Sequence, residues 1–68
     1  MKKTIKQLKN IISRQLGETN SALYQKDGNW LFECQEADKY TGIKIIQDAG
    51  WEIIHQESLN GLLFIIIK

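Results

Sequence analysis

The sequence predicts an α+β domain made of two consecutive αββ units, and three features support this prediction. The first feature is a pattern that recurs 33 positions apart, because Leu16-Gly17 corresponds to Ala49-Gly50 and Asp27-Gly28 corresponds to Asn60-Gly61. The second is a helical spacing of apolar residues before each Leu-Gly or Ala-Gly pair. The third is the Asx-Gly pair between two strand-like segments, which is typical of a tight β-hairpin turn.

The length and composition indicate one small globular domain of residues 1–68, with units at 1–35 and 36–68. The chain has 68 residues, of which 43% are hydrophobic and 25% are charged. Such a chain is near the lower limit for a self-sufficient core, and its single cysteine cannot form an internal disulfide. Two helices can cover one side of a four-stranded antiparallel sheet, so we expect both on one face. We also expect oligomerisation to supplement the small core.

The first helix is expected from about Thr4 to Leu16. At ~100° per residue, the apolar residues of this segment fall on one side of the helix and the cations on the other. The apolar residues are Ile5, Leu8, Ile11, Ile12 and Leu16. Gly17 is the expected end of this helix, because glycine readily adopts the positive φ found after a last turn.

The first hairpin is expected to turn at Asp27-Gly28. A two-residue turn there would place Leu23 opposite Phe32 and Tyr24 opposite Leu31. Trp30, Phe32 and Cys34 would then lie on the same face as Leu23, and we assign this face to the core. Two aromatic rings at alternate strand positions also occur on RNA-binding sheets, but no basic residue lies between Trp30 and Phe32, which favours core packing.

The second helix is expected from about Lys39 to Ala49, with Asp38 as a candidate N-cap and Gly50 as its end. Gly42 lies among its apolar residues, where a glycine costs about 1 kcal/mol of helix stability relative to alanine. We therefore expect close contact between the helix and the sheet at Gly42. Trp51 is expected to pack against the last turn of the helix.

The last strand, residues 62–67, is apolar at every position. A strand of this kind is normally buried on both faces, yet one face of a two-layer domain is open to water. We expect an outward protein interface, whose residues would be Ile54, Leu63, Ile65 and Ile67. Two alternatives stay open: the residues Leu62, Phe64 and Ile66 face outward instead, or one helix covers each face. If this strand lies at the edge of the sheet, it would also be an aggregation hazard.

The first 14 residues are strongly basic. They carry five cations and no carboxylate, whereas the whole chain has a net charge of only +1. The cations are Lys2, Lys3, Lys6, Lys9 and Arg14. This face is a candidate for nucleic-acid binding that is salt-sensitive and independent of sequence, and the alternative is an ordinary solvated helix face. We expect no membrane segment or signal peptide, and a cytoplasmic location.

Few residues are candidates for catalysis or for metal binding. The chain has one cysteine and one histidine, too few for a zinc site of the usual Cys/His type. A Cys34–His55 pair is the only candidate nucleophile and base, but we expect Cys34 to be a small buried hydrophobic residue. His55 is expected to lie half-buried near Phe64 and Ile66, on the same strand face as Ile53. We expect no catalytic residue, metal or cofactor.

Residues 44–56, a helix that ends in Gly-Trp and leads into a strand, resemble the corresponding segment of HicA-type mRNA interferase toxins. The resemblance implies this local fold, and in that family a catalytic histidine follows in the next turn. The turn of the present chain, Asn60-Gly61-Leu62, contains no histidine. The sequence therefore favours a non-enzymatic interaction module that binds itself or another protein, with nucleic-acid binding as the alternative and a ribonuclease toxin as a more remote one.

Overall fold

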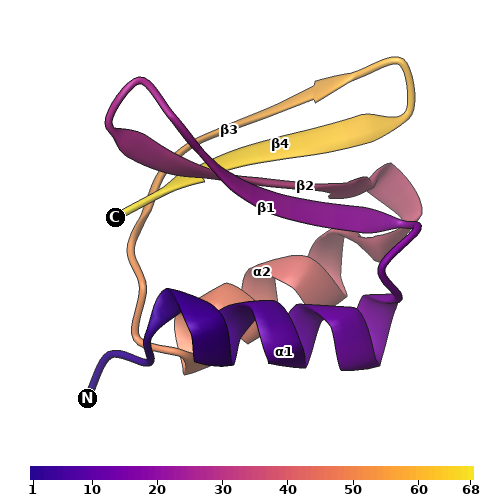
Figure 1. Ribbon diagram of the computed structural model, residues 1–68. Helices are drawn as coiled ribbons and strands as arrows, with labels where there is room; N and C mark the ends of the chain where they lie inside the picture. The colour runs from indigo at the N-terminus through magenta and orange to yellow at the C-terminus, as the bar shows by residue number, and fades with distance from the viewer.

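The computed structural model describes all 68 residues and has two helices packed on one face of a four-stranded antiparallel sheet (Figure 1). The α+β fold and its αββαββ order are as expected. The elements are α1 (Ile5–Leu16), β1 (Ser21–Lys26), β2 (Asn29–Gln35), α2 (Lys39–Asp48), β3 (Ile53–Leu59) and β4 (Leu62–Ile67), with one turn of 3₁₀ helix (Glu36–Asp38) before α2. Neither helix is long and apolar enough to span a membrane.

The strands lie in the order β1-β2-β4-β3. The second strand of each αββ unit is therefore central, and β2 and β4 pair antiparallel where the units meet. Because β4 has a neighbour on both sides, the sequence-based alternative that it is an edge strand is wrong. The edges are formed by β1 and β3, the first strand of each unit.

Both hairpins have the two-residue turn that the sequence predicts. Asp27 and Gly28 have φ values of 52° and 83°, and Asn60 and Gly61 have 53° and 82°. Positive φ at both central positions defines a type I′ turn, which follows the twist of the flanking strands. The turn at Asp27-Gly28 gives β1 and β2 the expected register, in which Leu23 pairs with Phe32.

Helix α1 begins one residue later than expected, because Thr4 is its N-cap. The Thr4 hydroxyl accepts a hydrogen bond from the Gln7 N–H at 3.2 Å, and the Gln7 side chain accepts one from the Thr4 N–H at 2.9 Å. This reciprocal capping box satisfies two N–H groups that otherwise have no helical partner. Gly17 ends the helix with a φ of 88°, as the sequence predicts.

The first three residues are fixed against the end of α2. The Lys3 N–H donates to the Ala49 carbonyl and the Trp51 indole N–H donates to the Lys3 carbonyl, both at 2.8 Å. The Lys2 ammonium lies 3.9 Å from the centre of the Trp51 ring, within the range of a cation–π interaction. A Cβ at Gly50 would lie 3.0 Å from the Lys2 Cα, so glycine permits this close approach.

Helix α2 ends one residue earlier than expected, and Asp38 precedes it without donating or accepting a capping side-chain hydrogen bond. Gly42 makes the close contact with the sheet that the sequence predicts. A Cβ at this position would lie 2.8 Å from the Cε2 atom of Phe32 and 3.5 Å from the Cys34 sulfur. The absence of a side chain thus allows the helix to lie directly on two core residues of β2.

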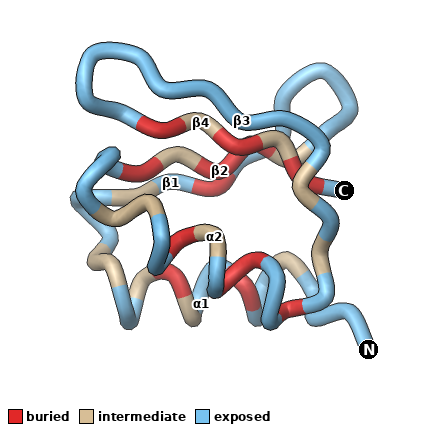
Figure 2. The backbone as a smooth tube through the Cα atoms, turned by 180° about the vertical axis from the view of Figure 1, so that it is seen from behind, coloured by how far each residue is buried: buried red, intermediate tan, exposed pale blue.

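The hydrophobic core lies between the helices and the sheet (Figure 2). It contains Leu63, Ile65 and Ile67, with exposures of 1%, 0% and 0%, so the expectation that these three residues face outward is wrong. The cause is the pairing of β4 with β2, where Leu63 lies opposite Cys34 and Ile65 opposite Phe32. Residues directly opposite each other in a sheet point to the same face. The alternative stated from the sequence, with Leu62, Phe64 and Ile66 facing outward, is the one the structure has.

Candidate functional site

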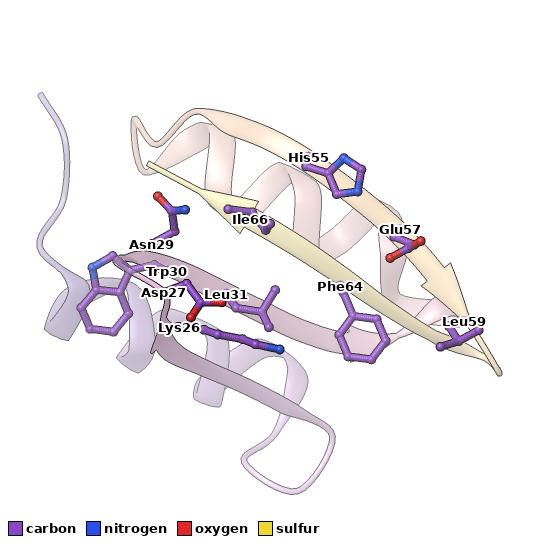
Figure 3. A pocket seen from close by; sticks show the side chains of 10 residues that line it. All are labelled: Lys26, Asp27, Asn29, Trp30, Leu31, His55, Glu57, Leu59, Phe64 and Ile66. Carbon is purple, nitrogen blue, oxygen red and sulfur yellow. The ribbon is translucent and has the colours of Figure 1, made fainter.

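The sheet has an outward face that neither helix covers, and the centre of this face is apolar (Figures 1 and 3). Leu31 of β2 pairs with Ile66 of β4. Phe64 precedes Ile66 by two residues in β4 and therefore lies on the same side of the sheet. Leu62 and Leu59, which pair across the β3–β4 hairpin, are 37% and 61% exposed. We call these five residues the sheet-face patch: Leu31, Leu59, Leu62, Phe64 and Ile66.

A shallow groove of about 400 Å³ runs over the sheet-face patch. Figure 3 shows the side chains of Leu31, Ile66 and Phe64 along its middle, with polar residues on the strands to either side. The polar residues are Lys26, Asp27 and Asn29 near the first turn, and His55 and Glu57 on β3. An apolar floor with a polar rim is the arrangement found in protein interfaces.

Glu33 of β2 lies directly opposite Phe64 of the patch, and Tyr24 lies on the neighbouring edge strand β1. The Tyr24 hydroxyl donates a hydrogen bond to the Glu33 carboxylate at 2.8 Å. This hydrogen bond raises the pKa of Tyr24, because ionisation would remove the donor. The phenol therefore stays neutral and holds the Glu33 carboxylate on the outward face of the sheet.

Ile54 is the only residue of the predicted interface that is exposed, at 50%. It lies in a β-bulge of β3, between Ile53, which pairs with Ile67, and His55, which pairs with Ile66. The bulge reverses the alternation of side chains, so Ile53 packs against the core while His55 faces outward. The expectation that Ile53 and His55 share a face is therefore wrong.

Leu31 was missed as a site residue, although its alternation with the core residue Phe32 could have indicated it.

Cys34 and His55 do not form a catalytic pair, because they lie on opposite faces of the sheet. Cys34 is 1% exposed within the core, whereas His55 is exposed on the edge strand β3, and so is more accessible than expected. No group of three or more histidine, cysteine, aspartate or glutamate side chains is arranged to hold a metal ion.

The Cys34 thiol is expected to be unreactive in the folded protein. Burial raises its pKa from the ordinary 9.0 to about 11, and the nearby Asp38 carboxylate contributes to the increase. Because the thiolate is the nucleophile, the reaction with a disulfide reagent at pH 8 should be at least about 100-fold slower than in the urea-unfolded chain.

The same shift predicts a loss of stability in alkali. The native thiol keeps its proton up to about pH 11, whereas the unfolded chain loses it near pH 9. The native state thus binds more protons between these values, and the contribution of Cys34 to the free energy of unfolding should fall as the pH rises through this window. A Cys34→Ala variant should lack this dependence in urea titrations at pH 8 and pH 10. Equal pH dependence of both proteins would contradict the assignment.

The structure separates the five basic residues of the first 14 into different surroundings. Lys2 lies on the Trp51 ring, Lys9 lines a shallow hollow next to Glu18, and Lys6 is exposed on α1. Lys3 and Arg14 line a groove of about 490 Å³ between the two helices. The sequence did not predict that Lys44 of α2 lies in the same groove, because only the packing of the helices brings it there. We call Lys3, Arg14 and Lys44 the basic groove.

Together these features define a small two-layer α+β protein with an apolar sheet face on one side and a basic helix layer on the other. Comparisons of the chain with protein-family models, with curated proteins and with solved structures find no match. Residues 44–56 do form the end of α2, the connection and the start of β3, as their resemblance to HicA-type toxins implies. The turn at Asn60-Gly61 carries no histidine, and His55 lies within β3.

Proposed function

We propose that this protein is a non-enzymatic interaction module that forms a homodimer through its outward sheet face. The observation that carries the proposal is the sheet-face patch. An antiparallel sheet covered on one side normally alternates between apolar and polar residues, so that its open face is polar. Strand β4 instead has Leu62, Phe64 and Ile66 on the open face. A second layer over this face would bury them.

A second copy of the chain is the partner that the composition of the molecule supports best. The core between the helices and the sheet consists of only 11 buried residues, and Cys34 is a free thiol, so no disulfide supplements it. Domains of this size commonly gain stability by oligomerisation. A two-fold axis would also let one patch serve both partners, because the same surface is then used twice.

The charges on the face are compatible with such a dimer. Consider a two-fold axis that runs parallel to the sheet and above its outward face, perpendicular to the strands and between Phe64 and Ile66. It would place Ile66 of one copy over Phe64 of the other, with the strands of the two sheets nearly aligned. On the edge strand the same operation places His55 over Glu57, so that an imidazole N–H can donate to a carboxylate. On β2 it places Glu33, which lies opposite Phe64 and is hydrogen-bonded to Tyr24, over Leu31 of the other copy.

The size of the face indicates a weak dimer. Four strands of about six residues give a footprint of roughly 20 by 19 Å, or about 400 Å² in projection. Standard interfaces bury about 800 Å² on each partner, so we expect dissociation in the micromolar range. Sedimentation velocity between about 5 and about 500 µM brackets this range and should show a monomer at the low end and a dimer at the high end.

Substitution of Phe64 by lysine tests the assignment of the face. The aromatic contact at the centre of the interface would be lost and a long charged side chain would have to be desolvated beside Glu33, so dimerisation should weaken at least about tenfold. Gln47→Lys is the matched control, because it adds the same charge at an exposed position of α2 on the other side of the molecule. It should leave the dimer unchanged. A wild-type protein that is monomeric at about 500 µM would overturn the proposal, and so would equal weakening by both substitutions.

A further inference from the structure

The two helices form the surface opposite the sheet face, and most of the positive charge on this surface is not paired with a carboxylate. The chain has a single ion pair, between Lys44 and Asp48 of α2 at 3.5 Å. None of the five cations of the first 14 residues therefore has a carboxylate within 4.0 Å, and all five residues are exposed. A concentration of unpaired positive charge on one side of a protein attracts polyanions.

The basic groove arranges part of this positive charge along a channel between the helices. Lys3 and Arg14 lie along one wall and Lys44 along the other, over a floor that includes Ile11 and Ile45. Asp48 also lines the groove and pairs with Lys44 at 3.5 Å, so Lys3 and Arg14 are its two cations without a carboxylate partner. Helix α1 is about 18 Å long, so the three cations are spread over a channel rather than gathered at one point. An extended chain of phosphates fits such a channel better than a single small anion does.

An exposed aromatic ring lies one helical turn before Lys44. Tyr40 of α2 is 83% exposed and precedes Lys44 by four residues, which places both side chains on the same face of the helix. A large aromatic residue with so little contact in its own protein can stack on a nucleobase. Cationic channels combined with exposed aromatic rings are the usual surface of proteins that bind single strands without sequence preference.

From these observations we propose that the basic groove binds the phosphate backbone of single-stranded nucleic acid, with one base stacked on Tyr40. The arrangement of the helices disfavours a duplex. A helix that reads DNA projects into a major groove about 12 Å wide, which accommodates one helix. Here α1 and α2 lie side by side in one layer (Figures 1 and 2), and neither can enter alone.

This proposal does not depend on the homodimer. The basic groove and the sheet-face patch lie on opposite sides of the molecule, so a dimer formed through the patch leaves both grooves exposed. The two proposals can consequently fail separately. Oligomeric state tests the patch, and binding of a short oligonucleotide tests the groove.

The test is fluorescence anisotropy with a labelled oligothymidylate of about ten nucleotides, a length within the usual site sizes. Binding should be measurable at low salt, and the slope of log K against log salt should be about −1.4, as expected for contacts of a single strand with the two unpaired cations Lys3 and Arg14. A duplex of the same length should bind more weakly. Absence of binding at low salt would overturn the proposal, and a duplex that binds equally well or better would overturn the choice of a single strand.

Two double variants distinguish binding by the groove residues from an effect of net charge on the affinity. Arg14→Glu/Lys44→Glu reverses two groove residues, and Lys9→Glu/Lys68→Glu reverses two exposed cations outside the groove, so both proteins have a net charge of −3 instead of +1. We expect the first variant to lose at least about tenfold in affinity and the second less than about threefold. Equal losses would show that only net charge matters and would overturn the proposal. Circular dichroism confirms that both variants are folded.

Tyr40 has its own test. Tyr40→Ala should weaken binding of the oligothymidylate about tenfold, whereas Tyr40→Phe should keep the affinity, because stacking requires the ring and not the hydroxyl. The slope of the salt dependence should be the same in all three proteins, since no cation has changed. Unchanged affinity of Tyr40→Ala would remove the stacked base from the proposal.

Discussion

Replacing Ile65 with lysine should unfold the protein, whereas the same substitution at Phe64, the preceding residue of β4, should leave it folded. Ile65 has no exposed surface and lies opposite Phe32 in the core. Loss of its packing costs about 2 to 5 kcal/mol, and a buried ammonium without a partner adds several more. A domain of this size has a total stability of roughly 3 to 10 kcal/mol, which is of the same size as this loss.

Phe64 differs because its side chain is only half-buried and points away from the helices. A lysine there can extend into water along the sheet face. Far-ultraviolet circular dichroism and thermal melts at low micromolar concentration measure both variants without the influence of a dimer. A folded, cooperative Ile65→Lys protein would mean that the wrong face of β4 has been assigned to the core.

These adjacent residues also show which part of the fold the sequence could predict. The pairing within each hairpin follows from the type I′ turn, because two residues at Asp27-Gly28 permit one register only. The pairing of β2 with β4 joins strands that are separated by α2 and β3, and no local turn determines it. Because β4 is apolar on both faces, a shift by one residue would have left its sequence pattern equally plausible. Only the observed register assigns Ile65 to the core.

The residues of the candidate sites could be predicted from the sequence where they lie on one helix or strand, but not where two elements have to pack together. The basic residues of α1 could be identified from the sequence, but Lys44 completes the groove from a helix of the other αββ unit. In the same way, the bulge at Ile54 turns His55 to the outward face. Glycine and proline often mark such irregularities, and neither is present there, so the sequence carried no signal for it.

Substitution of Gly42 by alanine should destabilise the protein, although alanine is the better helix former. In an isolated helix this change would gain about 1 kcal/mol. In the structure the new Cβ would lie 2.8 Å from the Cε2 atom of Phe32, whose ring is fully buried and cannot move away. Overpacking of this kind costs about 1 to 3 kcal/mol, which leaves a net loss of up to about 2 kcal/mol and should lower the melting temperature by up to about 16 °C.

Thr41→Ala is the control for helix propensity, because Thr41 is the exposed neighbour in the same helix. It should leave the melting temperature unchanged or raise it slightly. The decisive measurement is the same glycine substitution in a Phe32→Leu background, where the ring atom that clashes is gone. There Gly42→Ala should become stabilising, and the double-mutant cycle should give a coupling energy of about 1 to 3 kcal/mol between the two positions. If Gly42→Ala has the same effect in both backgrounds, contact with Phe32 is not the reason why α2 carries a glycine.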